Sequence, residues 1–291
     1  MKAKGRNMER DWKGAPDIAV FAHGYFRPAL SLLLKISEMG RFVTYDFDPA
    51  IVADHPVLFI PSGSLSGMDK SQRLKAKLDE YVKSGGTLVV LAQEFGSHYE
   101  LLPAPVNPAT GEAPLLSGYG YQQDQNCQFG SVIVEEKHPV LSGFTSSTGN
   151  VGVDGYFTSI PYGAKVLLRR TTNGYPALVV YPYGKGYVIA GAVFTDWALT
   201  HGQATAEEIN LVANILAWAK KPADLPSVRE NETISGEIPV HNFTGTSASS
   251  VLLTLYTPDR SKEVTSQKVS VVLPPGGTGR ARFTFPFAGL G

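Results

Sequence analysis

Short apolar runs alternate with amphipathic stretches over the first part of the chain. Continuous apolar runs are typical of strands buried on both faces of a parallel sheet, and they lie at 17–22, 56–60 and 87–91, with a further strand predicted at 41–46. Helical spacing of apolar residues predicts one helix that begins near Pro28 and ends at Gly40, and a second over 69–84, with Asp69 and Gln72 at the spacing of a capping box. With right-handed crossovers, this order of elements predicts a doubly wound parallel sheet.

The pattern becomes irregular over 103–150, where Pro, Gly, Asn and Gln dominate and only one strand, at 131–135, is predicted. A long irregular segment inside a compact domain often carries function or contacts a partner. Three further strands are predicted at 164–169, 177–181 and 187–194. The last two indicate an antiparallel hairpin, and Thr205 and Glu208 have the spacing of a capping box that opens a helix ending before Pro222.

A change of pattern near the C-terminus indicates a second domain. The prolines of KPADLP (221–226) mark a linker. After it, apolar and polar residues alternate in four stretches, at 234–240, 250–256, 264–273 and 280–285. These predict a small all-β sandwich of immunoglobulin-like type, incomplete at its end, as if the chain were part of a longer protein. The expected domains are a polar lead-in (1–14), an α/β domain (15–221), a linker (222–226) and a β-sandwich (227–291).

Composition removes several classes of function. The 26 Lys and Arg balance the 26 Asp and Glu, so no net field attracts nucleic acid or an anionic membrane. No apolar run approaches the ~20 residues of a membrane span, and no signal peptide is visible. The single cysteine, Cys127, excludes an internal disulfide framework and a cysteine-based zinc site. No cofactor is expected. Both a cytoplasmic and a periplasmic or envelope-associated location stay open.

Four segments resemble class I glutamine amidotransferase-like domains, in the order in which that group has them. They are YVKSGGTLVVLAQ (81–93), HPVLSGF (138–144), GYPALVVYPYGKGYVIAGAVFTDWA (174–198) and NLVANILAWA (210–219). The resemblance is greatest to the ThuA-like branch and the β-galactosidase trimerisation domain, and it covers roughly Asp17 to Lys220. It implies an α/β fold with a doubly wound, mostly parallel, flavodoxin-like sheet and helices on both faces.

The chain departs from that group where its chemistry would lie. A working amidotransferase has a cysteine at the sharp turn after the central strand and a His-x-Glu pair downstream. Here the turn carries Gln93 and Glu94, and the downstream segment has Asp196. Cys127 lies in the irregular segment with no basic neighbour in sequence to lower the pKa of its thiol. Because acyl transfer needs an activated nucleophile, glutaminase activity is not expected.

Polar residues follow the predicted strand ends, which meet at one edge of a doubly wound sheet. The residues concerned are His23, Ser62, Ser64, Gln93, Glu94, His98, Asp196, Trp197 and His201. One interpretation is a ligand-binding cleft in which Glu94 or Asp196 acts as a general base with a histidine such as His98. The other is that these residues only cap helices and bond the backbone. A metal site from His23, Glu94 and His98 has weak spacing, and no metal is predicted.

The aromatic residues near the predicted hairpin also have two interpretations. These are Tyr175, Tyr181, Tyr183 and Tyr187, with Trp197. They stack on a sugar or a partner, or they simply cover a sheet face. The leading hypothesis for the chain is a catalytically silent module for assembly or for recognition of a small-molecule, carbohydrate or protein partner, within a larger envelope-associated or carbohydrate-related protein. The alternative is a hydrolase of a sugar or amide that uses Glu94, His98 and Asp196.

Overall fold

The protein divides into two compact units, Met1–Ala223 and Asp224–Gly291. The computed structural model describes residues 16–124, 131–135, 137–221, 233–242, 246–256, 263–275 and 277–286. The predicted lead-in (1–14), the linker (222–226) and Cys127 lie outside the described residues.

The first unit is built on a sheet of nine strands. In spatial order these are β2 (Gly40–Val43), β1 (Ile18–Phe21), β3 (Val57–Ile60), β4 (Thr87–Val90), β11 (Gly186–Gly191), β10 (Pro176–Tyr183), β9 (Lys165–Arg170), β6 (Val132–Val134) and β7 (Thr148–Gly149). The five strands from β2 to β11 pair in parallel, and counted along the chain they follow the order 2-1-3-4-5 of a flavodoxin-like sheet. The α/β prediction is confirmed at this level.

Half of the sheet departs from the prediction of mostly parallel pairing. All pairings from β11 through β10, β9 and β6 to β7 are antiparallel. The hairpin β10–β11 was expected, but the strands beyond it were not assigned to the same sheet. Antiparallel pairing needs no crossover helix, and none of the described residues between β6 and β11 lies in an α-helix.

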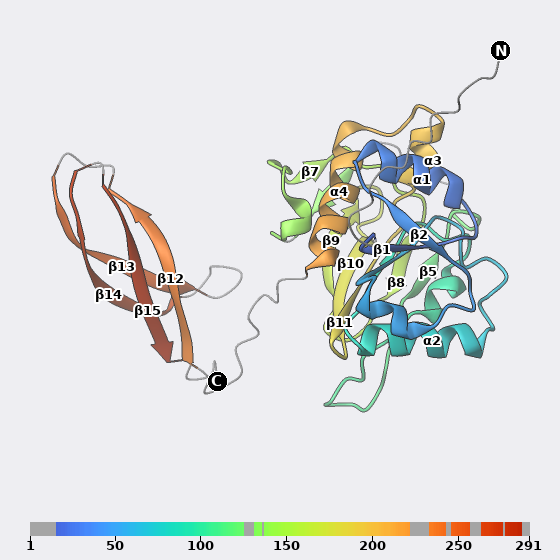
Figure 1. Ribbon diagram of the computed structural model, residues 1–291, viewed down its shortest axis with the longest axis horizontal. Helices are drawn as coiled ribbons and strands as arrows, with labels where there is room; N and C mark the ends of the chain where they lie inside the picture. Colours follow the sequence, from blue (N-terminus) through green and yellow to red (C-terminus); the bar gives the residue numbers. More distant parts are fainter. Residues whose placement is uncertain are drawn as a thin grey trace, which may run out of the picture. The chain divides into compact units, whose positions relative to one another are not determined.

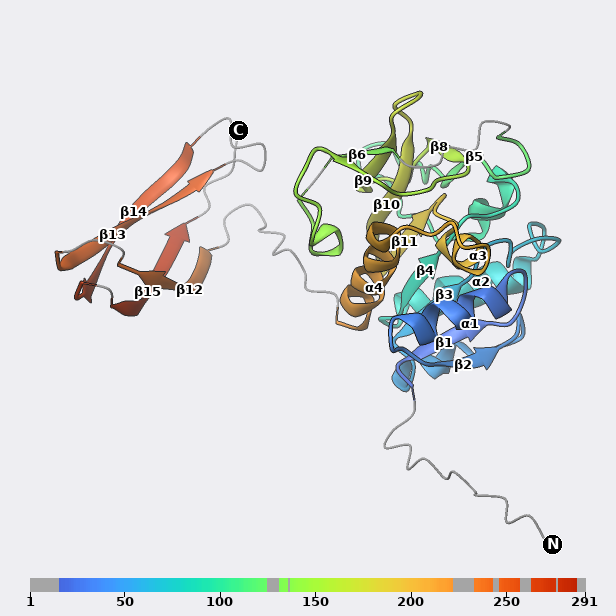
Figure 2. The ribbon, with the colours of Figure 1, turned by 90° about the horizontal axis from the view of Figure 1, so that it is seen from above.

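Helices cover both faces of the parallel half (Figures 1 and 2). On one face α1 (Phe26–Lys35) and α4 (Ala206–Lys220) pack against the sheet, through side chains that include Leu32, Leu33 and Leu211. On the opposite face lies α2 (Gln72–Lys83), with Leu74 and Leu78 in the core. Shorter elements complete the unit: the 3-10 turns η1 (Pro49–Ala53), η2 (Gly96–Leu101) and η3 (Pro139–Leu141), the helix α3 (Thr195–Thr200), and the small sheet β5 (Ser117–Tyr119) with β8 (Tyr156–Ser159).

Two helix boundaries differ from the prediction for local reasons. The first helix ends at Lys35 rather than at Gly40, because Ser37 takes the left-handed conformation (φ 61°) and the N–H of Glu38 turns back to the carbonyl of Leu33 at 2.8 Å. The second helix is capped by Ser71, whose hydroxyl accepts from the N–H of Leu74 at 3.2 Å, and not by Asp69.

The capping box that opens α4 is confirmed. The N–H of Glu208 donates to the Thr205 hydroxyl, and the N–H of Thr205 donates to the Glu208 carboxylate, both at 3.1 Å.

The second unit contains antiparallel strands only, among the residues that are described. The strand β12 (Thr233–His241) pairs with β15 (Thr278–Pro286), and β13 (Ala248–Tyr256) pairs with β14 (Glu263–Leu273). All four strands fall where alternation of apolar and polar residues predicted them.

Candidate functional site

The loops after β1 and β3 lock together at the carboxyl edge of the sheet. The helix that follows β1 lies on one face and the helix that follows β3 lies on the other, which makes this the topological switch point where flavodoxin-like folds bind ligands. The N–H of Tyr25 donates to the carbonyl of Ser62 at 2.9 Å. Gly24 has φ +59°, and a Cβ there would lie 2.6 Å from backbone atoms of Ser62 and Gly63, so only glycine permits this approach.

Asp196, in the first turn of α3, is fully buried against the loop after β3. Its carboxylate accepts from the Ser62 hydroxyl at 2.6 Å, from the Ser62 N–H at 2.9 Å and from the Trp197 N–H at 2.9 Å. Its side chain has no exposed surface. Burial raises the pKa of this carboxyl, while the hydrogen bonds from Ser62 and Trp197 oppose the rise. Asp196 therefore ties the end of β11 to the end of β3.

Gln93, just beyond the end of β4, is also fully buried, and its side chain bonds the backbone. Its amide oxygen accepts from the N–H of Leu65 at 2.9 Å, and its amide nitrogen donates to the carbonyls of Pro61 and Leu91 at 3.0 and 2.9 Å. The side chain thus fastens β4 to the loop after β3. It has no reactive atom turned to solvent.

The irregular segment supplies residues that sequence patterns did not single out. The N–H groups of Tyr121 and Gln122 donate to the carbonyls of Gln93 and Glu94 at 3.1 and 3.0 Å. A Cβ at Gly120 would lie 2.4 Å from the carbonyl oxygen of Gln93, so glycine allows this close approach. The prediction that 103–150 carries functional residues was general, and nothing in the sequence pointed to these two.

Asp154 is held near the end of β11 by hydrogen bonds of its own segment. Its N–H donates to the carbonyl of Ala192 at 2.8 Å, just beyond the end of β11, and Val153 bridges to Val193. An ordinary loop aspartate has no sequence pattern that would separate it from the others in this chain.

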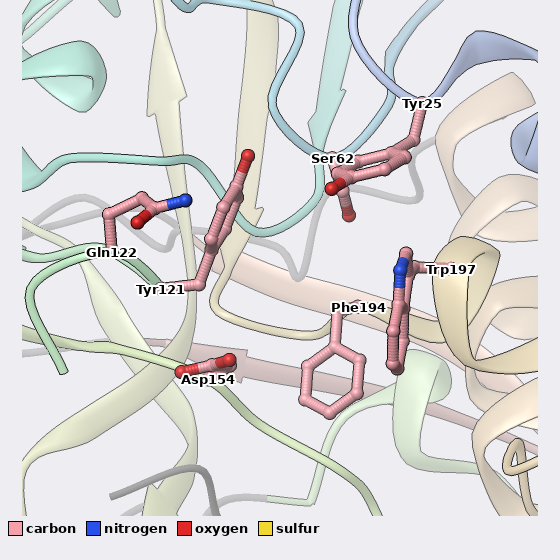
Figure 3. A pocket seen from close by; sticks show the side chains of 7 residues that line it. All are labelled: Tyr25, Ser62, Tyr121, Gln122, Asp154, Phe194 and Trp197. Atoms are coloured by element: carbon pink, nitrogen blue, oxygen red, sulfur yellow. The ribbon is translucent and has the colours of Figure 1, made fainter. Parts of the chain in front are cut away.

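These elements enclose a cavity of about 230 Å³ at the carboxyl edge of the sheet (Figure 3). It is lined by Tyr25, Ser62, Tyr121, Gln122, Asp154, Phe194 and Trp197. Its volume lies below the roughly 300–1,000 Å³ of pockets for drug-sized ligands, so the cavity suits a smaller molecule. Of the predicted ligand residues, Ser62 and Trp197 line it.

The other predicted residues lie beside or away from this cavity. The exposed His23 and the buried Ser64 join the loops after β1 and β3 by two hydrogen bonds. His23 Nδ1 lies 3.0 Å from the Ser64 carbonyl, and the Ser64 hydroxyl donates to the His23 carbonyl at 2.7 Å. His201 is exposed and stacks on Trp197, with ring centroids 4.0 Å apart.

Glu94 and His98 form a separate group. The Ser66 hydroxyl donates to Glu94, and the His98 Nδ1 accepts from the Phe95 N–H at 3.4 Å. Burial lowers the pKa of His98, against the negative charges of Asp69 and Glu94, which raise it.

The three candidate catalytic residues do not form one constellation. Within the described part of the chain, no hydrogen bond joins any two of Glu94, His98 and Asp196. No group of three or more His, Cys, Asp or Glu side chains among the described residues could hold a metal ion. None of the described helices combines the length and apolar character of a bilayer span.

The strand order and the switch-point cavity define the chain as an α/β protein with a flavodoxin-like sheet. No protein-family model matches the sequence, and neither does any curated protein.

Three solved structures similar to the chain come from different kinds of protein. A cytoplasmic protein of Salmonella typhimurium LT2 is 17% identical over 70% of this chain and 100% of its own, with a TM-score of 0.49. A ThuA-like protein from Bacteroides uniformis is 11% identical over 72% of this chain and 94% of its own, with a TM-score of 0.47. A β-galactosidase from Bacillus circulans is 13% identical, with a TM-score of 0.43; the match covers 92% of this chain but 41% of the enzyme. The fold assignment rests on the strand order of the chain itself.

Proposed function

We propose that the α/β unit is a non-catalytic recognition module that binds a small molecule in the switch-point cavity, within a larger carbohydrate-related or envelope-associated protein. The observation that carries the proposal is the state of Asp196. Its carboxylate is buried and accepts three hydrogen bonds from Ser62 and Trp197, so it holds these two lining residues in place and does not itself line the cavity.

The remaining groups also favour binding over turnover. A general base must reach the proton that it removes, within about 3 Å or through one water. Glu94 and His98 do not line the cavity, and Gln93 is occupied by three backbone partners. What faces the cavity is mostly aromatic surface, with a few polar groups that fix orientation, as in ligand pockets generally.

One observation favours the alternative, a hydrolase of a sugar or amide. The Ser62 hydroxyl donates to Asp196, whose pKa is raised by burial, and a serine beside a perturbed carboxyl is one form that an active site takes. In that case Asp196 would accept the proton of Ser62 during attack. The same hydrogen bond serves a purely structural role, since it joins the ends of β3 and β11.

A ligand panel separates these functions. We expect at least one member of a panel of monosaccharides, small amides and small organic cations to raise the unfolding temperature of the protein in a saturable manner. Trp197→Ala should abolish that effect, because it removes one wall. Glu94→Gln should leave it unchanged, and so should the control Tyr175→Ala, which alters a tyrosine outside the cavity. Hydrolysis of a panel member that is lost in Asp196→Asn would contradict the proposal.

The proposal includes assembly with a second copy of the chain through the edge of the sheet. The strand β2 is at one end of the strand order; Phe42 within it is 50% exposed, and Tyr45, two residues beyond it, is 56% exposed. An edge strand with exposed apolar side chains is a template for pairing with another strand. Light scattering should therefore show a dimer that Phe42→Lys dissociates; a wild-type monomer at high concentration would rule the assembly out.

A further inference from the structure

The walls of the switch-point cavity are mostly aromatic, with one acidic residue. Four of its lining side chains are aromatic: Tyr25, Tyr121, Phe194 and Trp197. Asp154 adds a carboxylate, and none of the lining residues is Lys, Arg or His. Aromatic ring faces carry partial negative charge, so rings and a carboxylate together attract positive charge.

The rings are arranged around the space and not as one platform. Figure 3 shows Tyr121 on one side, with Phe194 and Trp197 facing it from the other. The planes of Tyr25 and Tyr121 are tilted by 54°, and those of Phe194 and Trp197 by 65°. A sugar ring stacks on one flat aromatic face, whereas a rounded alkylammonium group is contacted by several rings set at angles.

Two backbone donors beside the cavity are already occupied by a carboxyl group of the protein. Loops at this edge of the sheet commonly bind anions through backbone N–H groups. Here the N–H groups of Ser62 and Trp197 both donate to Asp196, so a carboxylate of the protein itself occupies that position. An incoming phosphate or carboxylate would find both of these donors occupied.

The surroundings of Tyr121 point the same way. Burial raises the pKa of the Tyr121 hydroxyl, and the neighbours Tyr25, Glu94 and Asp196 raise it further. Two of these neighbours are acidic residues, and none is basic.

We propose that the cavity binds a small organic cation, of the methylated or quaternary ammonium class, with its alkyl groups against the four rings and its charge balanced by Asp154. This inference rests on the proposed function and names the ligand class of that site. The volume of about 230 Å³ accommodates a trimethylammonium group with a short chain.

Two ligands of the same shape test the role of charge. Choline and its uncharged isostere 3,3-dimethyl-1-butanol differ at one atom, nitrogen against carbon. Calorimetric titration of the wild-type protein should give saturable binding of choline at least roughly tenfold tighter than binding of the isostere. Asp154→Asn should weaken choline several-fold and leave the isostere unchanged, while the surface control Asp46→Asn should alter neither. Thermal unfolding of each variant verifies that it is folded.

The outcomes separate this inference from the proposed function. Equal affinity for choline and the isostere, or no choline binding up to about 10 mM, would overturn the cation assignment. If a monosaccharide or amide then binds in a way that Trp197→Ala abolishes, the recognition module stands with another ligand class. If no member of the panel binds, or if one is hydrolysed, the recognition module fails as well.

Discussion

Asp196 is the residue at which burial and hydrogen bonding act against each other. The carboxyl group is fully buried and accepts hydrogen bonds from Ser62 and Trp197. Its pKa is raised above the ordinary value, so the folded state holds the proton to a higher pH than the unfolded chain does. Stability from this group is therefore fully present below the unfolded pKa and is lost as pH rises through the folded one.

The raised pKa of Asp196 predicts how the effect of Asp196→Asn on stability depends on pH. The asparagine NH₂ would face one of the N–H donors that the carboxylate now accepts, which should lower the free energy of unfolding by about 1–3 kcal/mol. The loss should be largest near pH 4 and shrink toward about pH 7, because only the wild type loses stability as its carboxyl ionises. Urea unfolding at both pH values measures this, with Asp46→Asn as control. A destabilisation that grows with pH would show that the sign is wrong.

At the scale of elements, the contact between the loops after β1 and β3 determines the shape of the cavity. Gly24 and Gly67 both have positive φ, +59° and +72°, but only Gly24 meets backbone atoms where a Cβ would be; at Gly67 there is nothing within 4 Å. The two glycines therefore separate conformational strain from steric collision.

Gly24→Ala should destabilise the protein more than Gly67→Ala does. Both substitutions carry a left-handed strain of about 1 kcal/mol or more, and Gly24→Ala adds an overpacking cost of about 1–3 kcal/mol. Because it separates Tyr25 from Ser62, it should also weaken ligand binding. The test is to measure the free energy of unfolding and the ligand affinity of both variants, Gly24→Ala and Gly67→Ala. Equal losses in the two variants would mean that the loops are not in contact.

The sequence predicted the three central strands of the parallel half, β1, β3 and β4, because each is a continuous apolar run. The strands at Ile18–Phe21, Val57–Ile60 and Thr87–Val90 all fall inside predicted runs. The short strands β5, β7 and β8 were missed because two to four residues are too few for alternation to be seen. The end of α1 was misplaced because Ser37, not glycine, takes the left-handed position.

The candidate site was predicted only in part, because only some of its residues directly follow strand ends. Ser62, Asp196 and Trp197 follow strand ends, and the rule that strand ends converge identified them. Tyr121, Gln122 and Asp154 reach the cavity through backbone hydrogen bonds to Gln93, Glu94 and Ala192, which leave no trace in side-chain pattern. Gln93 was predicted as a ligand-binding residue, but its side-chain amide is fully engaged with the backbone at Leu65, Pro61 and Leu91, which the sequence does not reveal.

At the scale of the whole molecule, the two units should be separable. The hydrophobic clusters of the first unit consist of residues between Ile18 and Ala219, among those that the structure describes. A fragment of residues 1–223 should therefore unfold in one cooperative transition, at the midpoint of the corresponding transition in the full chain, and keep its ligand binding. Calorimetry of both proteins tests this. A fragment without a cooperative transition would show that the first unit depends on residues 224–291.

The most direct test of the central claim is fluorine NMR of protein labelled with 5-fluorotryptophan. The chain has three tryptophans, Trp12, Trp197 and Trp218, and Trp197→Phe assigns the resonance of the cavity residue. Titration with choline should shift the Trp197 resonance in a saturable manner and leave that of the buried core residue Trp218 in place. A Trp197 resonance that does not move under choline, any monosaccharide or any amide of the panel would contradict the account of this cavity as a binding site.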